Sequence, residues 1–482
     1  MMKTPVLALV FLLCARAGAP TDPDALAAKL RALPPEFAAD GLLRLAGLGS
    51  IEKPRRIALL GEAFEKAAGA QQPFKRRAAT ARLDGAPGFL NRAYYQNLDT
   101  LSLRVRAVEA MLPLDAGKAA ALFLRIPPPQ LPRVTCEEFM VYDPGLFYEV
   151  LGKLAGRNSE PYRLLARYTS AVTSPVEIGP MARVLAAQRK VQDADFAVLV
   201  RSFAGALGKI SGDDRSFTHS LPAEKDIQDL TNELKRRSLT PLPLLEAWRL
   251  YLVNNLSGPR CADDDIMQSG GGTFGLLSAI PVGGTTIGYV PFFNDQLRMP
   301  PLQPIQEVET TPSRIEGAAT GLRSCEEPDC QAMAKEFRGL VFDKAGNAYP
   351  TAARTTPEWQ AKFKAALAAL AAWSPESNPN PEYYREKTRA YNNLLTLAPD
   401  EAGREAVVRA TLSFVAQNPF AKESRMEWFL PINALLGRMS LDPMGLGKLS
   451  NELAACGDPV IAAYAELERA APRTPDLIMP LL

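Results

Sequence analysis

The stretch TPEWQAKFKAALAALAAW, residues 356–373, shows the pattern that decides the fold. Its apolar residues recur every three or four positions, which places them on one face of a helix. Thr356 before Pro357 marks the helix start, because a threonine side chain can accept a hydrogen bond from a first-turn N–H and proline fits the first helical position. The segment therefore predicts an amphipathic helix that buries the face made of Trp359, Phe363, Leu367, Leu370 and Trp373.

The same signal for a helix start, a capping residue followed by proline, recurs through the C-terminal third of the chain. Prolines return about every 20 residues, and Asn380, Asp442 and Asp458 precede three of them as N-caps. Each step has room for one helix and a turn, and short connections make neighbouring helices pack antiparallel. Helical hairpins of about 40 residues are typical of α-solenoids, although no tetratricopeptide or ankyrin consensus is present. The prolines are Pro357, Pro381, Pro399, Pro419, Pro443 and Pro459.

The N-terminal half has the same helical texture. A second apolar stripe contains Leu98, Leu101, Val105, Val108 and Leu112, and the connections are short and rich in proline or glycine. The sequence therefore predicts an all-α protein whose antiparallel helical hairpins stack as an irregular α-solenoid-like array. The expected helices are 23–33, 35–47, 53–69, 89–112, 115–125, 144–156, 160–173, 178–190, 193–209, 222–237 and 242–256.

Residues 257–325 interrupt this pattern with glycine clusters, a proline-rich stretch and interleaved apolar residues. A linker would be more polar, so we expect a long ordered insertion that packs on the helical body. Residues 340–349 resemble one small β-hairpin with a Lys-Ala-Gly-Asn turn. The predicted organisation is an N-terminal helical domain (20–256), an irregular insertion or connector (257–325) and a C-terminal helical-repeat domain (326–482).

The first residues have the features of an export signal. A basic Met-Met-Lys start precedes an apolar run from Thr4 to Leu13, and small residues follow. The run is shorter than the roughly 20 residues that a membrane-spanning helix needs. We expect a signal peptide at 1–17, with cleavage after Ala17 or, alternatively, after Ala19, and a secreted or periplasmic protein. A lipid anchor on Cys14 is a minor alternative, because the preceding residues lack the small residue of such sites.

Export changes the interpretation of the cysteines, because disulfides form in oxidising compartments. Five cysteines remain after removal of Cys14. Cys325 and Cys330 are the closest pair, and a local disulfide between them is the preferred interpretation. Cys136 and Cys261, both in irregular segments, could pair with each other or with one of these two. Cys456 lies on an apolar helical face and is expected to be a buried thiol.

Composition excludes several classes of protein. The 482 residues are 47% hydrophobic and 22% charged, with net charge +2, which indicates a folded chain of two or three domains. Without the leader, 53 basic residues balance 53 acidic ones, so nucleic acid is not an expected partner. The single histidine, His219, excludes zinc sites with several histidines and multihaem cytochromes, and no Gly-x-Ser-x-Gly motif accompanies it.

No residue is assigned to catalysis, a metal or a cofactor. Residues 263–265, three aspartates in the insertion, lack the spacing of a calcium loop, and the glycines at 270–272 lack the P-loop pattern. The basic clusters 74–77 and 235–237 are interpreted as solvated helix ends, with a polyanion-binding patch as the alternative. The glutamates at 137–138 are interpreted as first-turn acids.

Two functions remain open. The favoured one is an exported, non-enzymatic scaffold that binds an unidentified protein or peptide, because stacked helix pairs form extended binding surfaces. The alternative is a glycan hydrolase or lyase of helical-toroid type, which would use paired carboxylates 5–10 Å apart. Four tryptophans offer few platforms for sugars, which favours the scaffold. The partner and the oligomeric state are not determined by the sequence.

Overall fold

The structure is a computed structural model of the chain, and it describes two helical segments with short stretches between them. The described residues are 22–78, 97–135, 140–158, 160–210, 212, 214–217, 223–256, 260–261, 310–311, 328–343, 349, 351–374, 383, 387, 390–391, 393–395, 397–417 and 457–470.

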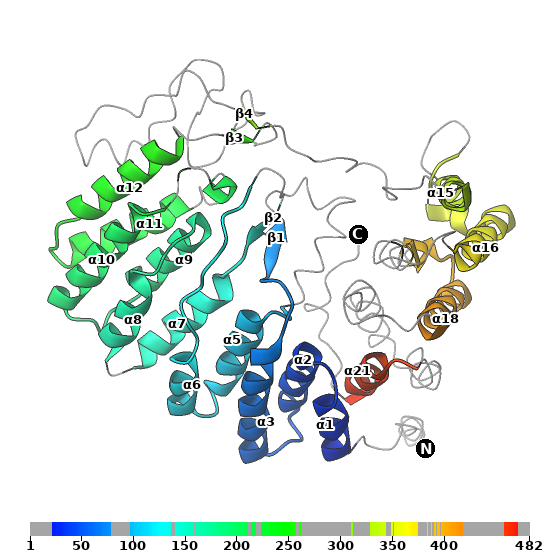
Figure 1. Cartoon of the computed structure of the whole chain (residues 1–482), viewed down its shortest axis with the longest axis horizontal. Coiled ribbons are helices and arrows are strands. Elements are labelled where there is room, and N and C mark those ends of the chain that lie inside the picture. The colour runs from blue at the N-terminus through cyan, green and yellow to red at the C-terminus, as the bar shows by residue number, and fades with distance from the viewer. Residues whose placement is uncertain are drawn as a thin grey trace, which may run out of the picture.

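The first segment is an array of helices that lie side by side along an arc, from blue to green in Figure 1. Their bounds agree closely with the sequence expectations, because each apolar stripe and each proline or polar cap is local in sequence. The helices are α1 (Pro23–Arg31), α2 (Pro35–Ala46), α3 (Lys53–Lys66), α5 (Thr100–Met111), α6 (Ala116–Phe123), α7 (Gly145–Arg157), α8 (Pro161–Thr169), α9 (Pro175–Ala186), α10 (Asp193–Leu207), α11 (Ala223–Arg236) and α12 (Leu242–Leu256). Turns of 3₁₀ helix occur at η1 (Ala67–Gly69), η4 (Arg215–Phe217) and η5 (Thr351–Thr355).

These helices stack in two rows. In one row α3 packs on α5, α5 on α7, α7 on α9 and α9 on α11; in the other, α8 packs on α10 and α10 on α12. Contacts between α5 and α6 and between α7 and α8 join the rows. This arrangement confirms the predicted all-α helical array.

Aromatic rings fill the space between the rows. The Phe123 and Phe147 rings stack with their centroids 5.1 Å apart, and Tyr168 meets both edge-on at 5.6 and 5.3 Å. The three rings come from α6, α7 and α8. Such rings bury a large apolar area, so the cluster stabilises the junction between consecutive helical hairpins.

The second segment contains α15 (Pro328–Val341), α16 (Pro357–Ala372), α18 (Glu401–Gln417) and α21 (Pro459–Ala470). Helix α15 packs on α16, and α16 on α18. Helix α21 packs against α1 and α2, so the last described helix lies beside the first two (Figure 1). Buried residues of both segments belong to one apolar cluster. The expected division into domains stays a prediction.

Several helix boundaries differ from their expectations. Helix α8 ends at Thr169 instead of 173, and α9 spans Pro175–Ala186 instead of 178–190. The helix expected over 89–112 begins at Thr100, and residues 79–96 lie outside the described part of the chain. Asn97 has a positive φ of 54°, and the Asp99 side chain accepts from the Ser102 N–H at 2.9 Å as an N-cap. Leu98 is buried although it precedes the helix, so its apolar character reflected packing and not helical periodicity.

Two short strand pairs accompany the helices. β1 (Arg76–Ala78) pairs antiparallel with β2 (Met140–Tyr142), with Arg77 opposite Val141. β3 (Arg260–Cys261) pairs in parallel with β4 (Thr310–Thr311), and most of the insertion at 257–325 lies outside the described residues.

The small hairpin expected at 340–349 does not form as proposed. Leu340 and Val341 end helix α15, Phe342 forms a bridge, and residues 344–348 lie outside the described part of the chain. The Tyr349 N–H donates to the Val341 carbonyl at 2.9 Å, so the chain does turn back there. Leu340 is buried and its carbonyl accepts from the Trp359 indole N–H at 3.1 Å, which shows that packing against α16 outweighs strand propensity.

The expected caps of the C-terminal helices can be tested at two sites. The Thr356 hydroxyl accepts from the Trp359 N–H at 3.4 Å, and Asp458 Oδ1 accepts from the Val460 and Ile461 N–H groups at 2.8 and 3.1 Å. Both are N-caps, as predicted. Asn380 and Asp442 lie outside the described residues.

Replacing Thr356 with alanine should lower the free energy of unfolding by about 1 kcal/mol, because a first-turn N–H loses its acceptor. Denaturant titration measures the change, and Thr356→Ser is the matched control because serine retains the hydroxyl. Equal stability of the alanine and threonine proteins would contradict the capping role.

Candidate functional site

A cavity of about 420 Å³ opens between the first turn of α5 and the segment that follows α6. One wall consists of consecutive prolines, Pro127, Pro128 and Pro129, and the opposite wall of residues from the start of α5. Pro127 and Gln130 are exposed at the rim. The volume lies within the range of ligand-binding pockets. The remaining lining residues are Gln72, Phe74, Asp99, Thr100, Leu101, Arg104 and Ile126.

Arg104 supplies the positive charge of this cavity. Its guanidinium lies 5.0 Å from the centre of the Phe64 ring, a cation–π contact that orients it. Its Nε is buried, and no acceptor among the described residues lies within hydrogen-bonding distance of that atom. Burial, together with the charge of Arg125, lowers the pKa of Arg104, so its environment disfavours the cation.

Glu65, a carboxylate whose charge acts on Arg104, is hydrogen-bonded to another arginine. Glu65 Oε1 and Oε2 accept from Arg125 Nη1 and Nη2 at 2.6 and 2.8 Å in a bidentate pair. That pairing lowers the pKa of Glu65. Both Glu65 oxygens are thus engaged by Arg125, and Glu65 acts on Arg104 through its negative charge.

Asp99 is the one carboxylate among the described residues that line the cavity. Its oxygens accept from the backbone N–H groups of Ser102 at 2.9 Å and Lys75 at 3.2 Å. Burial raises the pKa of Asp99, although these hydrogen bonds oppose the shift. The carboxylate thus caps α5, and no other described residue of the lining is an acid.

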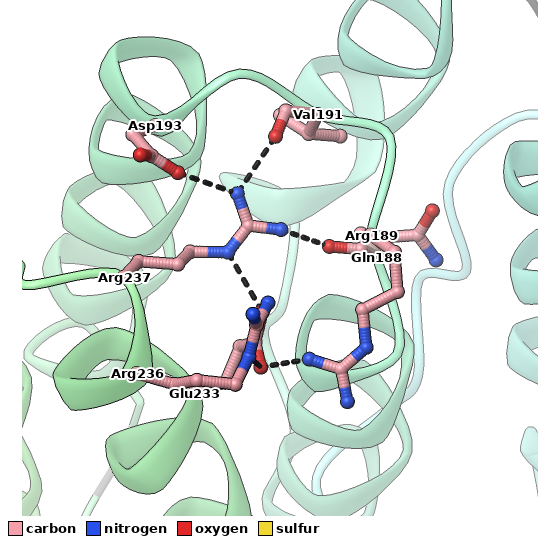
Figure 2. Close-up of polar contacts among 7 residues, drawn as sticks. All are labelled: Gln188, Arg189, Val191, Asp193, Glu233, Arg236 and Arg237. Carbon is pink, nitrogen blue, oxygen red and sulfur yellow. Dashed lines mark hydrogen bonds and ion pairs between the residues drawn. The ribbon is translucent and has the colours of Figure 1, made fainter.

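The basic cluster 235–237 surrounds a buried glutamate (Figure 2). Glu233 accepts from Arg236 Nε at 2.7 Å, from Arg237 Nε at 2.7 Å and from Arg189. Hydrogen bonds from Arg236, followed by those from Arg237 and Arg189, lower the pKa of Glu233 to about 2, although burial opposes them. The cluster joins the C-terminal ends of α9 and α11.

Arg237 is the buried member of this cluster, which corrects its interpretation as part of a solvated helix end. Its side chain is 5% exposed and donates to the Val191 carbonyl at 2.7 Å and to Asp193 at 2.9 Å (Figure 2). The guanidinium also lies 4.2 Å from the centre of the Phe196 ring. Arg236 is exposed, as the sequence predicted, so adjacent residues of one helix end have opposite environments.

The second basic cluster, 74–77, was wrongly interpreted as a helix end, because it leads into strand β1. Lys75 forms an ion pair with Asp143 at 2.9 Å. Arg76 lies 4.6 Å above the Tyr142 ring and donates to its hydroxyl at 2.9 Å. The Arg77 side chain is not described. The described cations therefore contact β2 and its flank, which favours a structural role over a polyanion-binding patch.

Lys387 is a buried amine in the C-terminal segment. Its Nζ donates to the carbonyls of Trp373 and Ala371, the latter at 3.2 Å, and lies 4.8 Å from the Phe414 ring centre. Burial lowers its pKa to about 8. Because the two carbonyls belong to the C-terminal end of α16, the lysine caps that helix.

Glu224 is a second buried titratable group, on the first turn of α11. Its side chain is buried, and Oε2 has no hydrogen-bond partner among the described residues. Burial raises its pKa from 4.5 to about 7. In the unfolded chain the carboxyl is solvated and loses its proton near pH 4.5.

The folded protein should therefore lose stability as pH rises from about 4.5 to about 7, because the folded form retains a proton that the unfolded form has released. Replacing Glu224 with glutamine should remove a dependence of about 1 kcal/mol per pH unit in this window. Denaturant titrations of both proteins from pH 4 to pH 8 measure it. A pH-independent difference between the two stability curves would contradict the assignment.

Several residues singled out in the sequence lie outside the described part of the chain: His219, the aspartates at 263–265, the glycines at 270–272, the glutamates at 137–138, Cys136, Cys325 and Cys456. The backbones of Cys261 and Cys330 are described, but their side chains are not. The disulfide pairings therefore stay predictions. Within the described ranges, no three His, Cys, Asp or Glu side chains gather as a metal site.

Sequence analysis missed Arg104 and Lys387, although a signal for both was present. Arg104 lies three residues after Leu101 and four before Val108, so it shares the apolar face of its helix. Lys387 lies four residues after Tyr383 and four before Tyr391, which is also a helical spacing. A cation within an apolar stripe is expected to be partly buried and to need a partner.

The fold and the cavity define an all-α helical-array protein with a proline-walled pocket that contains an arginine. Within the described residues, no helix has the length and apolar character needed to cross a membrane. No protein-family model matches the chain, and no curated protein matches it. Among solved structures, an engineered protein is 14% identical over 93% of this chain and 97% of its own, with a TM-score of 0.17. A TM-score this low carries no argument about fold or function.

Proposed function

We propose that this protein is an exported, non-enzymatic helical scaffold that binds a protein partner on the surface of its helix array. The observation that carries the proposal is the proline-walled cavity, which opens on the stacked array. Among the described residues, its Arg104 Nε has no acceptor and its lining holds no pair of carboxylates. Stacked helical hairpins form extended surfaces that commonly bind peptides and proteins.

The alternative, a glycan-active hydrolase or lyase, is less well supported. Such enzymes use two carboxylates that face the scissile bond, whereas the one carboxylate lining the cavity accepts hydrogen bonds from backbone N–H groups. Trp248, Trp359 and Trp373 are buried in the core and present no face to a sugar. Trp428 lies outside the described residues.

Site-specific photo-crosslinking in the native cell tests the scaffold function. A photoreactive residue at exposed Gln130, on the cavity rim, should crosslink one discrete partner that also crosslinks when both proteins are purified. The same residue at exposed Arg163, on α8, is the control position. No crosslinked partner at Gln130, or release of sugar products from glycans by the purified protein, would contradict the proposal.

Export is the second part of the proposal, and the leader at 1–17 supports it. Amino-terminal sequencing of the protein from its native cell should give Gly18 as the first residue, or Pro20 if cleavage follows Ala19. An intact Met1 on the mature protein would contradict cleavage. A lipid on Cys14 would instead indicate membrane anchoring.

A further inference from the structure

We infer that the cavity beside α5 binds an acidic, extended peptide segment of the partner, with an aspartate or glutamate carboxylate on Arg104 and the peptide backbone along the proline wall. This inference rests on the proposed scaffold function, because it names the chemistry of the partner that the array would bind.

The first argument is charge. Arg104 lines the cavity, and Glu65, the carboxylate that contributes to its electrostatic environment, has both oxygens bound to Arg125. The carboxylate of Asp99 is held by backbone donors. A ligand carboxylate would supply the acceptor that Arg104 lacks among the described residues, and arginine–carboxylate hydrogen bonds are among the stronger ones in proteins.

The second argument is orientation. The Phe64 ring lies 5.0 Å from the Arg104 guanidinium and 5.1 Å from that of Arg125, so both planar groups contact the same aromatic side chain. A guanidinium held in this way loses less conformational entropy when it binds a ligand. Arg104 is thus prepared for a carboxylate that enters through the cavity.

The third argument concerns the wall. Consecutive prolines have no N–H groups, so Pro127, Pro128 and Pro129 offer only carbonyl acceptors and apolar rings. An extended peptide carries N–H donors and apolar side chains that complement such a wall. Phe74 and Leu101 add apolar surface, and Thr100 and Gln130 add polar groups at the opening. A peptide is therefore favoured over an acidic glycan, because a glycan has hydroxyl donors for the carbonyls but no apolar side chains for the proline rings.

Selection from a phage-displayed library of random octapeptides tests the inference on the full-length protein. Wild-type protein should enrich peptides that carry an aspartate or glutamate at one fixed position beside an apolar residue. The Arg104→Gln protein should not enrich them. Arg163→Gln changes an exposed arginine on α8 and should enrich the same peptides as wild type.

Fluorescence anisotropy with the most strongly enriched acidic peptide measures how much Arg104 contributes to peptide affinity. Affinity should fall about 10-fold or more in Arg104→Gln, the factor expected when a hydrogen bond to a charged group is lost. A peptide with glutamine at the acidic position should lose the same factor, and the two changes together should cost no more than either alone. Enrichment of neutral or basic peptides, equal binding by Arg104→Gln, or displacement of the peptide by a polyuronate would overturn the inference.

The crosslinking experiment separates this inference from the proposed function. If Arg104→Gln still crosslinks the partner at Gln130 as wild type does, the acidic-peptide inference fails and the scaffold function stands. If wild-type protein crosslinks no partner, the scaffold function fails whatever peptides the library yields.

Discussion

Replacing Glu233 with alanine should lower the free energy of unfolding by about 3–5 kcal/mol, because a buried guanidinium would lose its carboxylate. Arg237 is the guanidinium at risk, since its side chain is 5% exposed. In the variant, the Arg237 Nη groups keep Asp193 and the carbonyls of Val191 and Gln188 as acceptors. The Nε group loses Glu233, its present acceptor. Denaturant titration at pH 7 measures the loss.

Arg236→Ala is the matched control for this prediction. Arg236 is exposed, and Glu233 keeps its hydrogen bonds to Arg237 and Arg189 when Arg236 is removed. The expected loss is at most about 1 kcal/mol, as for surface ion pairs. If the two variants lost similar free energies of unfolding, the buried contact between Glu233 and Arg237 would contribute little, and the prediction would be wrong.

Replacing Asp40 with alanine should lower the free energy of unfolding by about 3–5 kcal/mol and should weaken the packing of α21 against α2. The buried carboxylate accepts from Tyr464 Oη at 2.7 Å and from Arg106 Nη2 at 2.7 Å, so it links α2 to α21 and α5. Burial would raise the pKa of Asp40, but the charges of Arg106 and Arg44 and the two hydrogen bonds overcome this effect and lower it. Removal of the carboxylate therefore leaves a cation and a phenol without their partner.

Hydrogen exchange gives the local readout of this prediction. The amides of α21 should exchange faster in Asp40→Ala than in wild type at the same pH, and more so than those of α9. Lys29→Ala is the control, because it removes an exposed ion pair from α1 to Glu466 of α21. It should lower the free energy of unfolding by less than about 1 kcal/mol. Unchanged α21 exchange in Asp40→Ala would show that apolar contacts alone hold the helix.

The helices of the first segment were predictable because their signals are local. Pro35 and Pro161 start helices where the sequence predicted starts, and apolar residues at helical spacing face the core. The errors occurred where contacts distant in sequence outweigh local preference. Leu340 lies in the last turn of a helix, where its carbonyl accepts from the Trp359 indole N–H. Arg76 belongs to a strand that pairs with residues 140–142.

The candidate site was not predictable in the same way. The prolines at 127–129 were visible as a break between helices, but their position opposite Arg104 depends on how α5 and α6 pack. The insertion at 257–325, which the sequence predicts to be ordered and packed on the helical body, lies largely outside the described residues. Its role stays a prediction.

By itself, the sequence determined which segments are helical, which face of each is apolar, and that stacked hairpins would bury those faces, because these properties depend on residues within a few turns of one another. Only the tertiary structure decided that α21 lies against α1 and α2, that Arg237 is buried while Arg236 is exposed, and that Arg104 lines a cavity in which its Nε has no acceptor among the described residues. The physical reason is that the environment of a charged group depends on neighbours brought together by packing, and their positions are not encoded in local periodicity.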